Sequence, residues 1–204
     1  GSGPGAMLMT PWLKYMAEHH PSVQVAVSRG STELQLMQLR ERQLDALVVD
    51  VRRVATAPDL NMAHIVELRA GFVCRRGHPI LAQFPDQVPF DALLAYPMAS
   101  TPLSQEVARI MVDHYGPRAN PAHMTTLQCE EIPSLIDVVQ QTDAIYLGIL
   151  GAARQGLASG SLVELAMDPP FRAGALLALI TLAGRTELPI MSVFREFVTR
   201  QLTD

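Results

Sequence analysis

Hydrophobic and polar positions alternate most regularly between residues 23 and 50, where the pattern predicts strand, turn, helix and strand. Three valines occupy alternate positions from Val23 to Val27, and the run ends before Gly30. Residues 44–50 form a short continuous apolar run, which suits a parallel strand covered on both faces. The stretch therefore predicts one complete βαβ unit.

The helix inside this unit begins beside two hydroxyl side chains. Thr32 and Gln35 have the spacing of a capping box, so the Ser31-Thr32 pair is expected to hold the first helical turn. Free N–H groups at such a helix start also suit a small anion or a polar ligand. Capping and ligand binding are both open interpretations of this pair.

The same periodicities place elements along the rest of the chain. Apolar residues at helical spacing predict helices in the ranges 8–16, 107–114, 132–139, 152–158 and 190–202. Extended or short apolar runs predict strands at 61–69, 70–75, 96–100, 123–127, 144–150, 162–166 and 175–181. Strands that alternate with helices indicate an α/β fold with mostly parallel sheets.

Two interruptions predict that the chain forms two lobes. The link near residues 67–72 contains no helix, and Pro169-Pro170 breaks the chain near its C-terminal third. At both points the chain can cross from one lobe to the other, so one lobe is expected to contain residues 1–67 and 172–204. The other lobe is expected to contain residues 68–171.

Composition narrows the class of protein. Of the 204 residues, 49% are hydrophobic and 18% are charged, which is typical of a globular chain. The net charge of −4 argues against a nucleic-acid-binding surface in this chain, because such surfaces are normally basic. No apolar run approaches the roughly 20 residues that cross a bilayer. No secretion signal is visible either, so a cytoplasmic location is expected.

The sequence carries no catalytic signature. Dinucleotide-binding, phosphate-loop, nucleophile-elbow and zinc-protease motifs are all missing, and the histidines do not cluster at ligand spacing. We therefore expect no enzyme, no metal and no cofactor. Cys74 lies in an apolar strand and is expected to be a buried, inert thiol, whereas Cys129 suits either a pocket or the core. The polar turns at Ser31-Thr32 and Ser100-Thr101 are the best candidates for ligand contacts, because ligands of such folds lie at strand carboxyl ends.

Four passages, taken in order, are specific enough to compare with a family. They are the helix end and strand at 18–27, the passage from Leu39 into the strand at Leu44–Val48, the Gly77-His78-Pro79 turn within 74–80, and the helix-to-strand passage at 138–149. Together they resemble the effector-binding (regulatory) domain of bacterial LysR-type transcriptional regulators. One departure is the passage 142–146, which replaces a glycine-rich stretch, so Tyr146 is expected to intrude on the pocket.

The resemblance implies two Rossmann-like lobes hinged by two crossovers, as in periplasmic binding proteins of type 2. A small-molecule effector would bind in the cleft between the lobes and shift the geometry of the oligomer, and hence its DNA contacts. It also implies a homodimer, a tetramer for the full-length protein, and DNA binding only through a winged-helix domain that this chain lacks. Arg29, Arg75 and Arg76 would favour an organic acid as effector if they face the cleft, although surface arginines are commonly solvated.

Carried over by position, the resemblance assigns effector contacts to Ser2, Ser31, Thr32, Ser100, Thr101, Gln128, Cys129 and Tyr146. Ser2 belongs to the first loop, and the other residues belong to turns or to strand ends. Two other classes share the two-lobe architecture. One is a periplasmic solute-binding protein, and the other is an enzyme of the porphobilinogen deaminase or prephenate dehydratase type. The missing acid/base pair argues against the enzyme.

Overall fold

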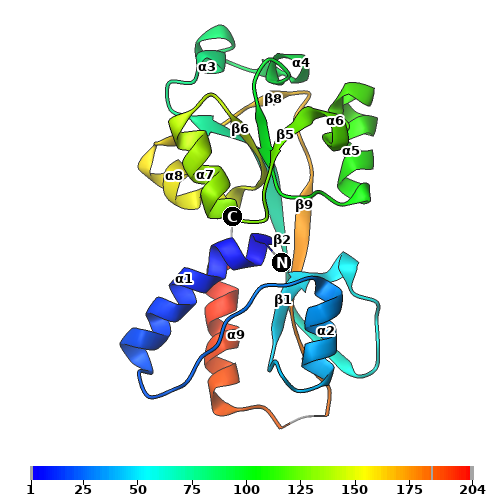
Figure 1. The fold of residues 1–204 in the computed structure, drawn as a ribbon, viewed down its shortest axis with the longest axis vertical. Coiled ribbons are helices and arrows are strands. Elements are labelled where there is room, and N and C mark those ends of the chain that lie inside the picture. The colour runs from blue at the N-terminus through cyan, green and yellow to red at the C-terminus, as the bar shows by residue number, and fades with distance from the viewer. Residues whose placement is uncertain (1, 185, 203–204) are drawn as a thin grey trace. The chain divides into compact units, whose positions relative to one another are not determined.

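The chain divides into two compact units. The computed structural model describes residues 2–184 and 186–202, apart from the side chains of His64 and Ile65 (Figure 1). Unit 1 comprises the residues up to Leu68 together with those from Ala175 onward, and unit 2 comprises Arg69–Gly174. Strands β2 and β9 each contain a boundary between the units.

Unit 1 is a small sheet with three helices. Its elements are α1 (Ser2–His19), α2 (Thr32–Arg40), β1 (Leu47–Asp50), a 3₁₀ turn (Val51–Arg53), the first half of β2 (Leu60–Arg75), β9 (Gly174–Leu182) and α9 (Pro189–Gln201). Strand β1 pairs with β9 in antiparallel register, with Leu47 opposite Ile180. Helices α1 and α9 meet through Trp12, whose ring centroid lies 4.9 Å from that of Phe194 and 5.0 Å from that of Phe197.

Residues 23–29 do not form the strand that the alternating valines predict. This stretch runs as chain without regular structure between α1 and α2, and Val23 and Val27 are 41% and 36% exposed. Within the described residues, no backbone hydrogen bond joins residues 24–28 to a strand. A strand is stable only when its N–H and C=O groups are hydrogen-bonded to a neighbouring strand. Residues 24–28 have no such neighbour among the described strands, so the first strand of the predicted βαβ unit does not form.

Two details at helix starts differ from the predictions, although one member of the Ser31-Thr32 pair does hold the first turn of α2 as expected. The first residues do not form a loop, because α1 begins at Ser2 and continues through Pro11. Ser31, not Thr32, is the N-cap of α2, and its Oγ accepts a hydrogen bond from Leu34 N at 3.2 Å. Thr32 is instead the first helical residue and is buried, so the expected capping box is absent.

Unit 2 is built around a mixed sheet. Its elements are the second half of β2, α3 (Pro79–Gln83), β3 (Val88–Pro89), α4 (Phe90–Leu93), β4 (Met98–Ser100), α5 (Gln105–Tyr115), α6 (Pro121–Met124), β5 (Thr125–Gln128), α7 (Ile132–Gln141), β6 (Ile145–Ile149), α8 (Arg154–Ser159), β7 (Leu162–Glu164) and β8 (Met167–Asp168). Strand β4 lies between β5 and β6 and is parallel to both. Strand β2 is antiparallel to β6 and β7, so the sheets are mixed and not mostly parallel.

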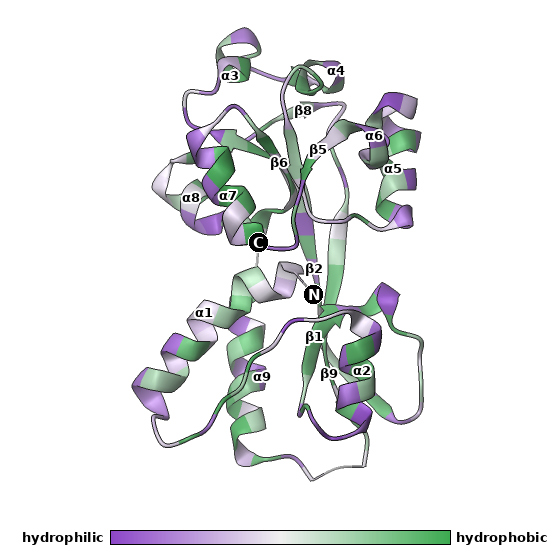
Figure 2. Cartoon of the chain, in the orientation of Figure 1, coloured by the Kyte–Doolittle hydropathy of each residue, from purple (hydrophilic) through white to green (hydrophobic). Residues whose placement is uncertain are grey.

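The core of unit 2 explains why its strands read as continuous apolar runs. Phe72, Ile145 and Leu147 are fully buried or nearly so, and Met111 of α5 and Val139 of α7 complete the helix contacts. Figure 2 shows hydrophobic and hydrophilic positions alternating along α5 and α7, as expected for helices with one face on a sheet.

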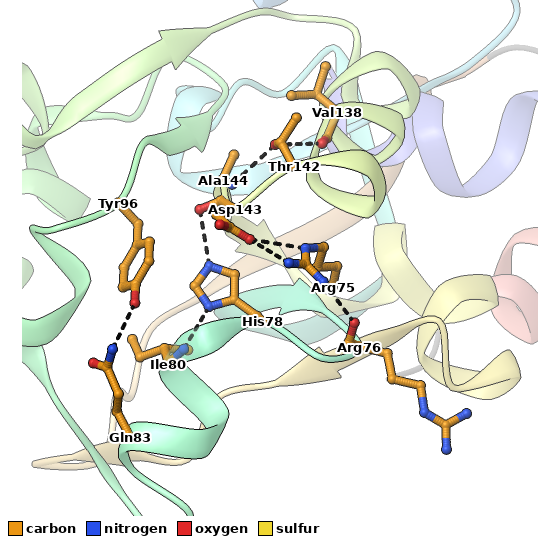
Figure 3. Close-up of polar contacts among 10 residues, drawn as sticks. All are labelled: Arg75, Arg76, His78, Ile80, Gln83, Tyr96, Val138, Thr142, Asp143 and Ala144. Carbon is orange, nitrogen blue, oxygen red and sulfur yellow. Dashed lines mark hydrogen bonds and ion pairs between the residues drawn. The ribbon is translucent and has the colours of Figure 1, made fainter.

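The Gly77-His78-Pro79 turn is held by a polar network (Figure 3). His78 is buried; its Nδ1 accepts a hydrogen bond from Ile80 N at 3.1 Å, and its Nε2 lies 3.0 Å from the carbonyl oxygen of Asp143. These contacts require the neutral tautomer that carries its proton on Nε2. Arg75 donates from Nε and Nη2 to Asp143 Oδ1, at 3.0 and 2.7 Å. The motif therefore joins the end of β2 to the turn before β6, and its role is structural.

Removing the buried imidazole should destabilise the domain. His78→Ala leaves Ile80 N and the Asp143 carbonyl without their partners, which should cost about 1–3 kcal/mol of unfolding free energy. Urea denaturation followed by circular dichroism measures the loss as a lower midpoint. His123→Ala, on an exposed face of α6, is the control and should leave the midpoint unchanged. Equal midpoints for both variants would contradict the structural role.

Candidate functional site: the carboxyl edge of β4 and β5

Four of the predicted contact residues lie together at one edge of the unit 2 sheet. Because β4 and β5 run parallel, their carboxyl ends meet, and the register places Ser100 opposite Gln128. Cys129 N donates to the Ser100 carbonyl at 3.3 Å, which extends the pairing one residue past β5. Ser100, Thr101, Gln128 and Cys129 thus form one continuous polar edge.

Two helices begin at this same edge. Helix α5 follows β4, and its N-cap Ser104 accepts a hydrogen bond from Val107 N at 3.3 Å. Helix α7 follows β5, with Glu131 at the N-cap position but without a side-chain cap bond. The first turn of a helix carries a partial positive charge and N–H groups that lack a partner within the helix, and at α7 these stand beside the carboxylate of Glu131.

The accessible side chains of the edge are those of Thr101, Gln128 and Cys129. Ser100 is fully buried, and its Oγ donates to the Thr101 carbonyl at 2.6 Å, so its only hydrogen is already engaged. Thr101 is half-buried and Gln128 is exposed. A hydroxyl and a carboxamide together can both donate and accept hydrogen bonds.

The two cysteines have contrasting environments. Cys74 is fully buried, and desolvation raises the pKa of its thiol from 9.0 to about 12, with the charge of Arg75 opposing that shift. Cys129 is partly exposed, and its Sγ accepts a hydrogen bond from Glu131 N at 3.3 Å. The prediction that Cys74 is a buried core thiol is confirmed, while Cys129 lies at the candidate site.

Tyr146 fills the interior of unit 2. Its side chain is 1% exposed, and desolvation raises the pKa of its phenol. A Cβ on Gly148 would collide with the Tyr146 ring, so glycine at 148 provides the space that the ring occupies. That Tyr146 intrudes on the effector pocket stays a prediction. The deep burial of its side chain does not favour a contact with a ligand.

The remaining predicted contacts belong to unit 1. Ser31 is engaged as the α2 cap, Thr32 is 8% exposed, and Ser2 is the first residue of α1. Sequence reasoning missed a cavity of about 520 Å³ in unit 1, bordered by α1, residues 23–29, Gln35, the chain leading into β1, and α9. No sequence signal marked it, because the alternating valines that border it predicted a paired strand.

Other classes of site find no support in the described part of the chain. No group of three or more His, Cys, Asp or Glu side chains is placed there to hold a metal ion. Arg75, considered as a partner for an acidic ligand, is paired with Asp143.

None of the helices in residues 2–184 and 186–202 has the length and apolar character that a membrane span requires.

Comparison with known proteins decides the family. The family model of the LysR substrate binding domain matches residues 1–203, which is almost the entire chain. This chain belongs to that family. The LysR domain is therefore the effector-binding domain of a LysR-type regulator, as the four sequence passages had indicated.

Individual relatives agree with this assignment. The SDS degradation transcriptional activation protein of a Pseudomonas species is 26% identical over 199 residues, covering 97% of this chain and 64% of the relative. The regulatory domain of CrgA, a LysR-type regulator from Neisseria meningitidis, has a TM-score of 0.70 at 15% identity, covering 98% of this chain and 94% of that one. The effector binding domain of QuiR in complex with shikimate has a TM-score of 0.57 at 18% identity, and the match covers 97% of this chain and 91% of that one.

The family assignment decides between the three classes of protein that share the two-lobe architecture. Its members are transcriptional regulators, so a periplasmic solute-binding protein is not favoured, and the enzymes of related fold have no comparable support. The two-lobed, periplasmic-binding-protein-like architecture is confirmed by the structural likeness. The LysR domain spans about two thirds of the curated relative, 64% of its length.

The two thiols should differ in reactivity. Iodoacetamide at pH 8 should modify Cys129 and spare Cys74 in the native domain, because the thiolate is the reactive form and burial suppresses it at Cys74. The raised pKa of Cys74 also makes the stability of the domain depend on pH. The contribution of this thiol to the free energy of unfolding should be complete below pH 9 and should be lost as the pH rises from 9 toward 12, because the unfolded chain releases the Cys74 proton first. Peptide mass spectrometry reads the modification; rapid labelling of Cys74 in the native state would contradict its burial.

Proposed function

We propose that the LysR domain senses a small organic anion at the carboxyl edge of β4 and β5, through Thr101 and Gln128. The observation that carries this proposal is the parallel register that places Ser100 opposite Gln128 while α5 and α7 both begin beside them. Strand ends and helix N-termini supply the donors that a carboxylate or sulfate group requires.

The class of effector follows from the charge of this edge. The hydroxyl of Thr101, the amide of Gln128 and the N–H groups of two helix starts supply donors but no full positive charge. A singly charged organic anion suits such a site better than a cation or a polyphosphate. The relatives are compatible with this choice: one is named for the degradation of SDS, and another holds shikimate.

The proposed mechanism is a shift of populations. An effector that binds one conformation of the LysR domain better than another biases the equilibrium by its differential affinity. In the whole protein we propose that this bias alters the geometry of a homodimer or tetramer, and thereby contacts with DNA made by a separate winged-helix domain. The predicted contribution of Ser2, Ser31 and Thr32 to effector binding stays part of this proposal.

A thermal-shift screen identifies the effector. At a hundred times its dissociation constant, a ligand adds about 2.7 kcal/mol of stability, which raises the melting temperature clearly. Organic acids and alkyl sulfates below their denaturing concentrations should give hits, whereas matched neutral alcohols should not. Hits confined to cations or to neutral compounds would contradict an anion site.

Substitutions at the edge should then weaken binding of a hit without unfolding the domain. Thr101→Ala removes one hydrogen bond and should raise the dissociation constant about fivefold, the equivalent of about 1 kcal/mol. Ser100→Ala should also weaken binding, because it frees the Thr101 carbonyl and loosens the edge. Isothermal titration calorimetry measures both affinities.

Gln128→Glu is the sharper test, because it adds a negative charge with almost no change in volume. It should raise the dissociation constant for an anion more than tenfold, through repulsion in a partly desolvated site. Gln141→Glu makes the same change at the exposed end of α7 and should leave the affinity unchanged. Equal affinities for the two variants would remove Gln128 from the site.

A further inference from the structure

The chain leaves unit 2 through a segment that side chains hold in place. Residues 169–173, the exit segment, lie between β8 and β9 and begin with two prolines, which have no backbone N–H to donate to a ladder. Tyr115 Oη donates to the Pro169 carbonyl at 2.8 Å, and His114 Nε2 donates to the Pro170 carbonyl at 2.9 Å. Both donors belong to the last turn of α5, so this helix end holds the exit segment where it runs toward β9 (Figure 1).

The two hydrogen bonds do not depend on pH in the physiological range. A carbonyl only accepts, so Nε2 of His114 carries a proton, and both the neutral Nε2–H tautomer and the charged imidazole meet this requirement. Desolvation, together with the charge of Asp168, raises the pKa of the Tyr115 phenol to about 12, so the phenol remains a donor. The contact is therefore a permanent feature of the unit.

Aromatic packing supports the same contact. The Tyr115 ring stacks on Phe90 with centroids 4.5 Å apart and lies 6.0 Å from the ring of Phe171, which follows the two prolines. Phe171 in turn lies 5.2 Å from Phe72 of β2. Aromatic pairs at such distances stabilise a structure beyond the area that they bury. The end of α5 and the exit segment are thus both hydrogen-bonded and packed together.

The other end of α5 lies at the candidate edge of β4 and β5. Its N-cap Ser104 follows Thr101 closely in the chain and accepts a hydrogen bond from Val107 N at 3.3 Å. Met111, between the two ends, is fully buried in the core of unit 2. A helix of 11 residues is about 16 Å long and is held together by its own backbone hydrogen bonds. One continuous element therefore joins the candidate edge to the exit segment.

We propose that His114 and Tyr115 form a latch on the exit segment, and that α5 couples this latch to the candidate edge. A change at the first turn of α5 acts on the helix as a unit, and the two latched carbonyls receive it at the other end. Because β9 continues from the exit segment across the boundary between the units at Gly174, the latch sets how firmly the chain is held where it leaves unit 2. The use of this latch by an effector rests on the proposed function, whereas the coupling itself does not.

Hydrogen exchange followed by mass spectrometry measures the hold on the exit segment. The latch-free variant combines His114→Ala with Tyr115→Phe, which keeps the stacked ring but removes its donor. Amides of residues 171–176 should exchange about fivefold faster in this variant, because losing the two bonds makes local opening easier. Asp113→Ala, in the same helical turn, is the control and should leave the rates unchanged. Equal rates in the latch-free variant and the unaltered chain would overturn the latch.

A double-mutant cycle tests the coupling without a ligand. Ser104→Ala removes the N-cap of α5, roughly 16 Å from the latch, and substitutions that far apart act independently unless the structure couples them. With the latch intact, Ser104→Ala should speed exchange in residues 171–176 about threefold or more. In the latch-free variant it should have no further effect. The same effect in both backgrounds, or none in either, would overturn the proposed coupling.

A matched substitution separates coupling from a loss of overall stability. Ser31→Ala removes the N-cap of α2 in unit 1 and should leave exchange in residues 171–176 unchanged. A rise equal to that caused by Ser104→Ala would show that these amides follow overall stability, and would overturn the coupling. The cycle contains no effector, so its failure would leave the proposed anion site standing, and failure of the thermal-shift screen would leave the latch standing.

Discussion

Backbone hydrogen bonding between neighbouring strands is the constraint on which the rest of this structure depends. Strand β4 has a parallel partner on each side and is buried at all three of its positions. Residues 23–28 include alternating valines, but within the described residues no backbone hydrogen bond joins residues 24–28 to a strand, and the segment forms no strand. The difference between the two segments lies in their neighbours, because the cost of leaving N–H and C=O groups unpaired outweighs side-chain preference.

The same constraint positions the candidate site. Parallel pairing fixes the register of β4 against β5, and register fixes which side chains share an edge. Ser100 is then committed to the structure through its bond to the Thr101 carbonyl, which leaves Thr101, Gln128 and Cys129 as the accessible side chains of the edge. Away from the edge, His78 and Asp143 stabilise the unit without facing a ligand. The polar residues therefore separate into those that support the fold and those that we propose as ligand contacts.

Sequence reasoning succeeded where the signal was local and periodic. The helix stripe containing Trp12 and the buried strands of unit 2 both follow from spacing. It failed where the outcome depended on distant partners. Choosing Ser31 over Thr32 as the cap requires the path of the chain entering α2. Burial of Tyr146 depends on the space that Gly148 leaves open, which a linear pattern does not encode. The polar turn at Ser100-Thr101 was found because strand ends are marked by composition, but its pairing with Gln128 needed the register.

The most direct test of the account locates a bound anion on the LysR domain. Hydrogen exchange with and without an organic acid that raises the melting temperature reports which amides the ligand covers. The account predicts slower exchange in residues 101–107 and 128–135, the chain that leaves β4 and β5 and enters α5 and α7. Protection elsewhere in the domain, with both of these segments unchanged, would contradict the central claim that the effector is read at this edge.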